Sequence, residues 1–272
     1  MANTFSNLLY SIRPSACLGV SLFALASYQD LSKIYISTLI FVATFSGSAA
    51  CFLINDIVDR KKDLLNKKHR PISTGALSLG IAKWVSVILI LAYMGLSALL
   101  SVNNFILSVL TVSIFLFYPG INNRNGLLSN ALVAISVSMS FLYGVIIKDI
   151  DLLIWAIMVS SFFIIIAREI MLDGLDIAGD KAFGKPSIPI SFGENGAFWS
   201  VAFGFVLGTI ALIYSVFQST TTSSSIILIL AIFALWIPLV ISKFQSNLNW
   251  MLFNVRSTHL FFALIIAALF LR

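Results

Sequence analysis

Long apolar runs separated by short polar segments dominate this chain of 272 residues and restrict its possible folds more than any other feature. The runs are about long enough for a tilted helix to cross a hydrocarbon core of ~30 Å. Inside a bilayer every backbone amide must be hydrogen-bonded within the protein, so only helices and closed barrels span it. The runs lack the alternating pattern of barrel strands. The sequence therefore predicts an all-α integral membrane protein.

We expect nine membrane-spanning helices in a single domain that covers residues 1–272. The expected helices cover residues 14–28, 32–56, 79–100, 104–118, 127–147, 152–172, 197–217, 225–244 and 255–271. Composition supports this topology, because 59% of the residues are hydrophobic and 10% are charged, whereas soluble domains carry about 25% charged residues. The N-terminal segment has no signal-peptide pattern, so we expect the first helix to be retained.

Basic residues are distributed unevenly over this topology. With the N-terminus inside, one side of the membrane holds 14 of the 17 Lys and Arg residues, and the other side holds Lys33, Lys148 and Arg272. Lys and Arg concentrate on the cytoplasmic side of membrane proteins. We therefore expect a multi-pass protein whose functional face, formed by the polar segments after the second and sixth helices, is cytoplasmic.

Those two polar segments contain most of the acidic residues. The chain has 11 Asp and Glu residues, and seven of them lie in or next to residues 55–63, the first acidic segment, and residues 173–180, the second. Both segments place Asp at positions i, i+3 and i+7: Asp56, Asp59 and Asp63 in the first, Asp173, Asp176 and Asp180 in the second. On a helix these positions share one face, so each segment can aim three carboxylates in one direction.

Carboxylates that face one another in an apolar protein need cations nearby, because like charges at short range otherwise favour protonation. Hard divalent cations that prefer oxygen ligands, above all Mg²⁺, meet this need. Mg²⁺ usually binds a protein through a few carboxylates and completes its coordination with substrate phosphates. The two segments therefore predict a phosphorylated ligand between them, and no nucleic-acid partner is expected.

The acidic segments and the residues after them resemble motifs of the UbiA superfamily of intramembrane prenyltransferases. The run NDIVDRKKD, followed by HRPISTGALS, is similar to N-D-x-x-D-x-x-x-D and a later R-P-[IL]-x-x-G. The run LDGLDIAGDKAFGKPSIPISFG is similar to D-x-x-D-x-x-G-D-x-x-x-G-x-x-T-L-P, with Ile188-Pro189 in place of Leu-Pro. The resemblance implies a nine-helix bundle around a central cavity. It also implies two Mg²⁺ ions that bridge the diphosphate of an isoprenoid donor, and transfer of the prenyl group to an acceptor.

In this interpretation each acidic segment holds one metal ion. The expected ligands are Asn55, Asp56, Asp59 and Asp63 for one ion and Asp173, Asp176 and Asp180 for the other. The residues expected to be catalytic are Asp59, Asp63, Asp176 and Asp180. Asp56 and Asp173 are expected to act indirectly or to bind basic residues.

Diphosphate oxygens also need cationic side chains, and an Arg can donate two hydrogen bonds to them at once. The candidates are Arg13, Arg70, Arg124, Lys181 and Lys185. By the family resemblance, Tyr118 and Asn130 line the substrate cavity.

The predicted reaction is Mg²⁺-dependent prenyl transfer within the membrane to a lipophilic acceptor, either an aromatic compound or a quinone precursor. Residues 34–54 contain no basic side chain that would hold a carboxylate, so a hydroxybenzoate-like acceptor is disfavoured. A terpene cyclase would ionise the same donor without an acceptor and is the alternative within this scaffold. A transporter is a third alternative, but its acidic residues would be expected near the middle of the membrane.

Overall fold

The computed structural model describes residues 4–66, 69–122, 124–147, 151–244 and 249–272. All regular secondary structure among these residues is helical, which confirms the predicted all-α class. The helices are α1 (Thr4–Ile12), α2 (Pro14–Tyr28), α3 (Ile34–Val58), α4 (Arg60–Leu65), α5 (Leu79–Leu100), α6 (Val102–Asn122), α7 (Gly126–Val145), α8 (Leu152–Leu175), α9 (Ile177–Ala182), α10 (Ile188–Gln218), α11 (Thr222–Phe244) and α12 (Trp250–Phe270). Lys67, Lys68 and Lys148, which belong to the predicted charge asymmetry, lie outside the described residues.

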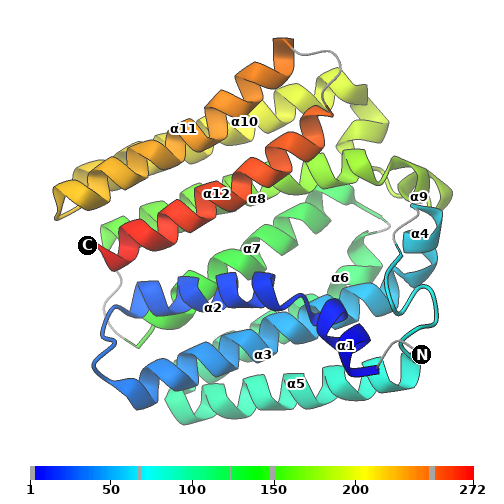
Figure 1. Cartoon of the computed structure of the whole chain (residues 1–272), viewed down its shortest axis with the longest axis horizontal. Coiled ribbons are helices and arrows are strands. Elements are labelled where there is room, and N and C mark those ends of the chain that lie inside the picture. The colour runs from blue at the N-terminus through cyan, green and yellow to red at the C-terminus, as the bar shows by residue number, and fades with distance from the viewer. Residues whose placement is uncertain (1–3, 67–68, 123, 148–150, 245–248) are drawn as a thin grey trace.

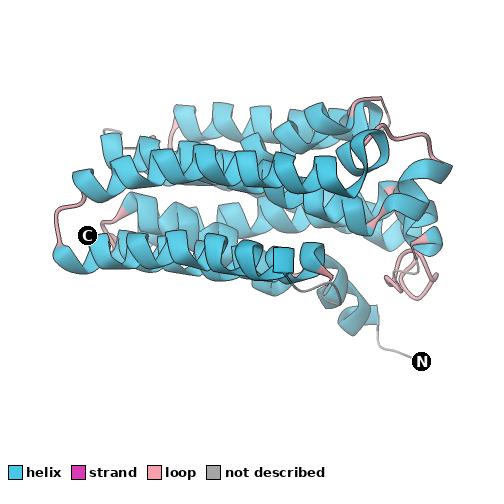
Figure 2. Ribbon diagram, turned by 90° about the horizontal axis from the view of Figure 1, so that it is seen from above, coloured by secondary structure: helices cyan, strands magenta, loops and turns pink. Residues whose placement is uncertain are grey.

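The long helices run side by side along the longest axis of the molecule (Figures 1 and 2). Helix α2 contacts α3, α7 and α12, and α8 contacts α7, α10 and α12, so these helices form the middle of the bundle. Helices α5 and α6 pack on one flank, and α10 and α11 pack on the other. The short helices α4 and α9 contact each other at one end of the bundle, on the right in Figure 1. This packing brings the two acidic segments together.

By length and apolarity, seven of the described helices qualify as membrane spans: α3, α5, α7, α8, α10, α11 and α12. Helices α1 and α2, which are bent by 44° relative to each other, qualify together as an eighth. The apolar part of α6, Val102–Tyr118, is shorter than the other spans. The structure therefore supports an integral multi-pass protein, although these criteria do not reproduce the predicted count of nine.

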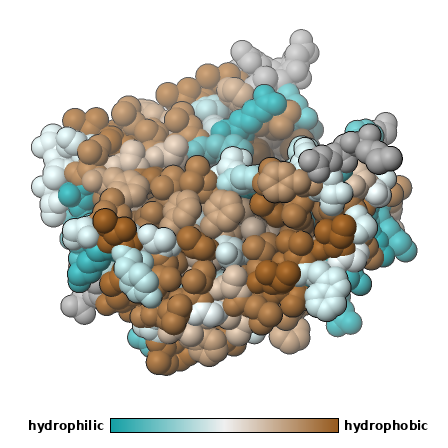
Figure 3. Space-filling model, turned by 60° about the horizontal axis from the view of Figure 1, so that its bottom comes forward, coloured by the Kyte–Doolittle hydropathy of each residue, from teal (hydrophilic) through white to brown (hydrophobic). Residues whose placement is uncertain are grey.

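The face of the molecule in Figure 3 is largely apolar, as expected for a protein in contact with lipid. Large side chains such as Trp84 and Phe217 are exposed on the flanking helices, at 69% and 78%. In a soluble protein so many exposed apolar side chains would favour aggregation, whereas lipid tails solvate them.

Two predicted loops are mostly helical. Residues 173–196 were expected to form a loop, but they contain the end of α8, all of α9 and the start of α10. Helix α4 likewise lies within the basic segment after α3. Helix α10 is interrupted at Gly193, because the backbone angles of this residue, φ 69° and ψ −173°, are not helical. Hydrophobic periodicity missed these helices because they are short and polar.

Helices α2 and α7 approach each other closely at Gly144. A Cβ atom added there would lie 1.9 Å from the carbonyl oxygen of Ala24. We expect Gly144→Ala to force these helices apart and to lower the free energy of unfolding by about 1–3 kcal/mol. Gly19→Ala on α2 is the matched control, since no atom lies within 4 Å of its added Cβ. Thermal unfolding in detergent tests this prediction, and equal melting temperatures for the two variants would contradict it.

Candidate active site

Both acidic segments cross a break between two helices, and the break falls at the middle aspartate of each. Asp59 separates α3 from α4 with φ −84° and ψ 4°, and Asp176 separates α8 from α9 with φ −108° and ψ 13°. Hydrogen bonds of helical type continue through each break, from Asp63 N to Asp59 O (2.8 Å) and from Asp180 N to Asp176 O (3.0 Å). Helical spacing is therefore kept across each break, and the three aspartates of each segment remain about one turn apart.

In the first acidic segment, arginines neutralise the buried aspartates. Asp56, 1% exposed, accepts a hydrogen bond from Arg13 Nη2 at 2.6 Å and a second from Arg70 Nη1. Arg70 Nη1 also lies 3.2 Å from Asp63 Oδ2, so one guanidinium joins two carboxylates of the segment. Asp56 therefore binds two basic residues in the structure.

Arg13 reaches this site because the chain bends sharply between α1 and α2. Its φ of 51° lies in the left-handed region, which is unfavourable for a residue with a side chain, and Pro14 follows as the first residue of α2. The guanidinium packs 4.7 Å from the centre of the Phe52 ring while it binds Asp56. The ion pair and the ring contact thus hold a strained backbone position.

In the second acidic segment a buried lysine takes the place of the arginines. Lys185 Nζ lies 2.5 Å from Asp173 Oδ1 and 3.9 Å from Asp180 Oδ2, and its side chain is 3% exposed. The turn after α9 positions it: Gly184 adopts φ 69°, and the amides of Gly184 and Lys185 donate to the carbonyl oxygens of Lys181 and Asp180. This is the Schellman arrangement, in which glycine ends a helix and the chain reverses. Asn130 Nδ2 donates to the other Asp173 oxygen at 2.9 Å, so this buried carboxylate is bound on both sides.

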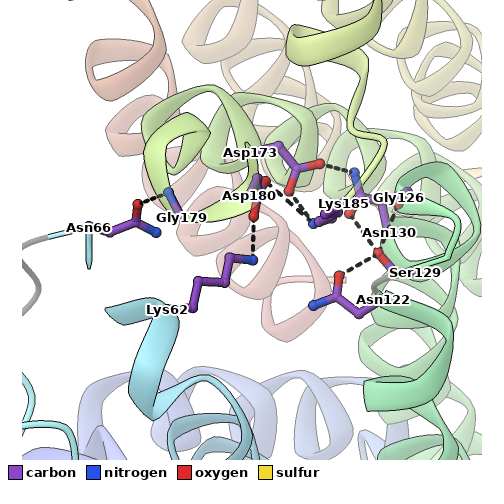
Figure 4. A network of polar contacts seen from close by, with 10 residues as sticks. All are labelled: Lys62, Asn66, Asn122, Gly126, Ser129, Asn130, Asp173, Gly179, Asp180 and Lys185. Carbon is purple, nitrogen blue, oxygen red and sulfur yellow. Dashed lines mark hydrogen bonds and ion pairs between the residues drawn. The ribbon is translucent and has the colours of Figure 1, made fainter. Parts of the chain in front are cut away.

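Contacts across the site join the two acidic segments (Figure 4). Lys62 on α4 forms an ion pair with Asp180, whose side chain is completely buried. One turn later, Asn66 Oδ1 accepts a hydrogen bond of 2.7 Å from the backbone amide of Gly179 on α9. The prediction that the segments meet at one end of the bundle is thereby confirmed.

Burial and charge shift the pKa values of this pair. Burial raises the pKa of the Asp180 carboxyl, and the charges of Lys185 and Lys62 offset only part of that effect. Burial lowers the pKa of Lys62, but the hydrogen bond to Asp180 and the negative charges of Asp180, Asp59 and Asp176 outweigh it and raise the pKa overall. The ammonium of Lys62 is therefore the positive charge that the carboxylates of both segments share.

The remaining predicted site residues are Asn55, Tyr118, Arg124 and Lys181. Asn55 is half-buried, and its side-chain amide lies 3.9 Å from the sulfur of Cys51. Tyr118 is half-buried near the end of α6. Arg124 and Lys181 are exposed, the first between α6 and α7 and the second on α9.

Sequence reasoning overlooked two residues, Lys62 and Asn66, which it counted only as part of a polar loop. Lys62 follows Asp59 by three positions and Asn66 follows Asp63 by three, so helical spacing places them on the acidic face. That spacing is the sequence signal that could have identified Lys62 and Asn66. The sequence could not identify their partners on α9, because Asn66 and Gly179 are 113 residues apart.

The carboxylates fit a magnesium site that a ligand would complete. Their donor atoms are oxygens, as Mg²⁺ prefers, and Mg²⁺ commonly takes one or two carboxylates together with substrate phosphates. Within the described residues no three His, Cys, Asp or Glu side chains already form a group that could hold an ion. The expected ligands Asp59, Asp63, Asp176 and Asp180 would contribute carboxylate oxygens, and phosphate oxygens would supply the remaining positions.

Together the fold and the site define a multi-pass membrane protein with an acidic site, compensated by buried cations, at one end of its helical bundle. The sequence model of the UbiA prenyltransferase family matches residues 14–271. The chain belongs to the UbiA prenyltransferase family, and it is a membrane-bound prenyltransferase.

Individual relatives agree with this assignment. The chain is 31% identical over 202 residues to a digeranylgeranylglyceryl phosphate synthase from Methanosphaera stadtmanae, covering 74% of this chain and 71% of that protein. A ligand-free UbiA homolog from Aeropyrum pernix K1 superimposes with a TM-score of 0.80 at 19% identity, over 93% of this chain and 98% of that one. A UbiA homolog from Archaeoglobus fulgidus bound to GPP and Mg²⁺ gives a TM-score of 0.68 at 21% identity, over 97% and 99%.

Proposed function

We propose that this enzyme transfers a prenyl group from an isoprenoid diphosphate to a lipophilic acceptor within the membrane and releases diphosphate. The observation that carries this proposal is the meeting of two acidic segments with Lys62, Lys185, Arg13 and Arg70 at one end of the bundle. The bond between the first prenyl carbon and the diphosphate oxygen breaks only if the charge that develops on the leaving group is stabilised. A site of alternating carboxylates and cations suits that task.

The proposed cofactor is Mg²⁺, as two ions. Asp59 and Asp63 would hold one ion and Asp176 and Asp180 the other, with Asn55, Asp56 and Asp173 in supporting positions. Bound Mg²⁺ would neutralise the departing diphosphate. The A. fulgidus homolog bound to GPP and Mg²⁺ supports this choice of ion and donor.

Several side chains of this chain have proposed roles toward the diphosphate and the prenyl group. Arg13, Arg70 and Lys185 lie at the carboxylates and would donate hydrogen bonds to diphosphate oxygens. Arg124 and Lys181 are exposed and would act at the entrance for the charged group. Tyr118 and Asn130 would border a central cavity for the prenyl chain, where an apolar lining keeps water from the allylic cation.

Two classes of acceptor are candidates, a prenylated glyceryl phosphate and an aromatic or quinone-precursor compound. The M. stadtmanae relative is a digeranylgeranylglyceryl phosphate synthase, which supports a glyceryl phosphate that already carries one prenyl chain. The sequence favoured an aromatic or quinone-precursor acceptor. We propose the glyceryl phosphate lipid as the first acceptor to test, because the relative's name identifies a product of that chemical class.

Mass spectrometry of products from the purified enzyme tests the proposed reaction. The enzyme would receive prenyl diphosphates of several chain lengths with a prenylated glyceryl phosphate, with an aromatic quinone precursor, or with no acceptor. We expect a prenylated acceptor and free diphosphate, and we expect chelation by EDTA to abolish both. A cyclic hydrocarbon or alcohol formed without acceptor would instead identify a cyclase, and undiminished turnover in EDTA would contradict the metal site.

We also propose that the site faces the cytoplasm. The end of the bundle with the acidic segments carries Arg13, Arg70, Lys62 and Lys185, whereas Lys33 and Arg272 lie at the opposite end near the α2–α3 turn and the C-terminus. This asymmetry follows the positive-inside rule. Labelling of a cysteine placed at Lys181 by a membrane-impermeant reagent tests it: we expect labelling in inside-out vesicles and protection in right-side-out vesicles.

A further inference from the structure

Lys62 occupies a central position in the acidic site, although the proposed reaction assigns it no role. Its ammonium forms an ion pair with Asp180, and the negative charges of Asp59 and Asp176 also act on it. The Lys62 side chain is 11% exposed, and the Asp180 side chain is 0% exposed. The lysine is therefore paired with one of the four carboxylates that would bind metal, and it comes from the opposite acidic segment to Asp180.

A second contact holds the same two helices together. Asn66 accepts the Gly179 amide hydrogen bond, and a Cβ at Gly179 would lie 2.6 Å from the Asn66 side chain and 2.8 Å from Lys62. Glycine thus permits α4 to approach the backbone of α9 closely enough for Lys62 to reach Asp180. Lys62 on α4 and Asn66 at its C-terminal end, one turn apart, contact the neighbouring positions Asp180 and Gly179 on α9 (Figure 4).

Lys185 also approaches Asp180, but its position is set differently. Its Nζ lies 2.5 Å from Asp173 Oδ1 and farther, 3.9 Å, from Asp180 Oδ2. Its own backbone amide donates a hydrogen bond to the Asp180 carbonyl oxygen. Lys185 is therefore fixed within the second segment. Lys62 reaches Asp180 through a long flexible side chain from another helix, so it is the cation that can leave.

We propose that Lys62 is a built-in counter-ion that occupies the cation position at Asp180 in the empty enzyme and is displaced when a divalent metal binds. A fully buried carboxylate requires a cation, and Lys62 supplies one before metal arrives. An ammonium and a divalent ion at the same carboxylate repel each other, so metal entry requires Lys62 to move away. Displacement breaks the ion pair between α4 and α9 and couples metal binding to the separation of the two segments. This inference rests on the proposed function through its metal site.

Direct binding of Mn²⁺ in the absence of diphosphate, measured by electron paramagnetic resonance on the detergent-purified enzyme, tests the competition. We expect Lys62→Met to tighten Mn²⁺ binding by about tenfold or more, the effect of removing one nearby positive charge. Lys61→Met is the matched control, because Lys61 is exposed on the same helix and should leave the affinity unchanged. We also expect EDTA to lower the melting temperature of Lys62→Met more than that of the wild type, and Mn²⁺ to restore it.

The outcomes separate the two proposals. If the wild type binds Mn²⁺ and Lys62→Met binds it equally or more weakly, the proposed role of Lys62 is wrong, but the proposed metal site is still supported. Absence of binding in both proteins would overturn both. Tighter binding in Lys62→Met than in Lys61→Met would support the displacement of Lys62.

A measurement that keeps Lys62 in place provides an independent test if the methionine variant does not fold. Spin labels on cysteines that replace the exposed residues Lys61 on α4 and Ala182 on α9 report the distance between these helices by double electron–electron resonance. We expect Mg²⁺ with a prenyl diphosphate to shift that distance distribution to longer values. A distribution that stays unchanged while substrate is bound would contradict displacement.

Discussion

Replacing Asp59 or Asp176 with alanine is expected to reduce the kcat/KM of prenyl transfer by about 10³-fold or more, equivalent to ~4 kcal/mol of lost transition-state stabilisation. These residues lie at the two helix breaks, at equivalent positions of the two acidic segments. Each loss would remove a proposed metal ligand from one side of the diphosphate. Steady-state kinetics with a radiolabelled prenyl diphosphate measures the effect.

Asp30→Ala provides the control, since Asp30 lies in the turn between α2 and α3 at the opposite end of the bundle. We expect that variant to retain activity within a factor of about two, the range of a surface change far from the chemistry. Monodisperse elution in detergent would verify that the Asp59 and Asp176 variants remain folded. Folded variants with more than a tenth of the wild-type kcat/KM would argue strongly against the paired acidic site.

Lys185→Met is expected to lower the free energy of unfolding by about 3–5 kcal/mol, the usual effect of removing one partner from a buried ion pair. The substitution would leave Asp173, 6% exposed, without its nearest cation and would also remove a positive charge 3.9 Å from Asp180. Unfolding of the detergent-solubilised protein by heat or by SDS measures the loss.

Lys181→Met is the matched control for this stability prediction. Lys181 precedes Lys185 on the same short segment but is exposed, so we expect a change below about 0.5 kcal/mol. Adding Asp173→Asn to Lys185→Met should recover part of the stability, because it removes the uncompensated charge itself. The interpretation fails if Lys185→Met and Lys181→Met unfold at the same temperature.

Much of the fold follows from patterns that are local in sequence. The apolar runs predicted the long helices, because each run is a property of consecutive residues. The distribution of Lys and Arg placed both acidic segments on one side, and the spacing of Asp56, Asp59 and Asp63 placed their carboxylates one turn apart. Family motifs then predicted a prenyltransferase, which the match over residues 14–271 confirmed.

Other features required the packed structure. The helix breaks at Asp59 and Asp176, the short helices α4 and α9, and the interruption at Gly193 have no strong periodic signal. Helix periodicity assigns a residue to a face but does not say which residue of another helix lies opposite. Because α1 and α2 are bent and the apolar part of α6 is short, the described residues contain seven or eight spans by length and hydropathy rather than the nine expected.

The sequence by itself determined a membrane-embedded helical protein with two aspartate-rich segments at one end, because hydrophobicity, charge asymmetry and helical spacing are each written in neighbouring residues. Only the tertiary structure decided the partners of three buried carboxylates: Arg13 and Arg70 for Asp56, Lys185 and Asn130 for Asp173, and Lys62 and Lys185 for Asp180. These partners come from several helices and connecting segments, and ion pairs form only where packing brings the two charges within a few ångströms.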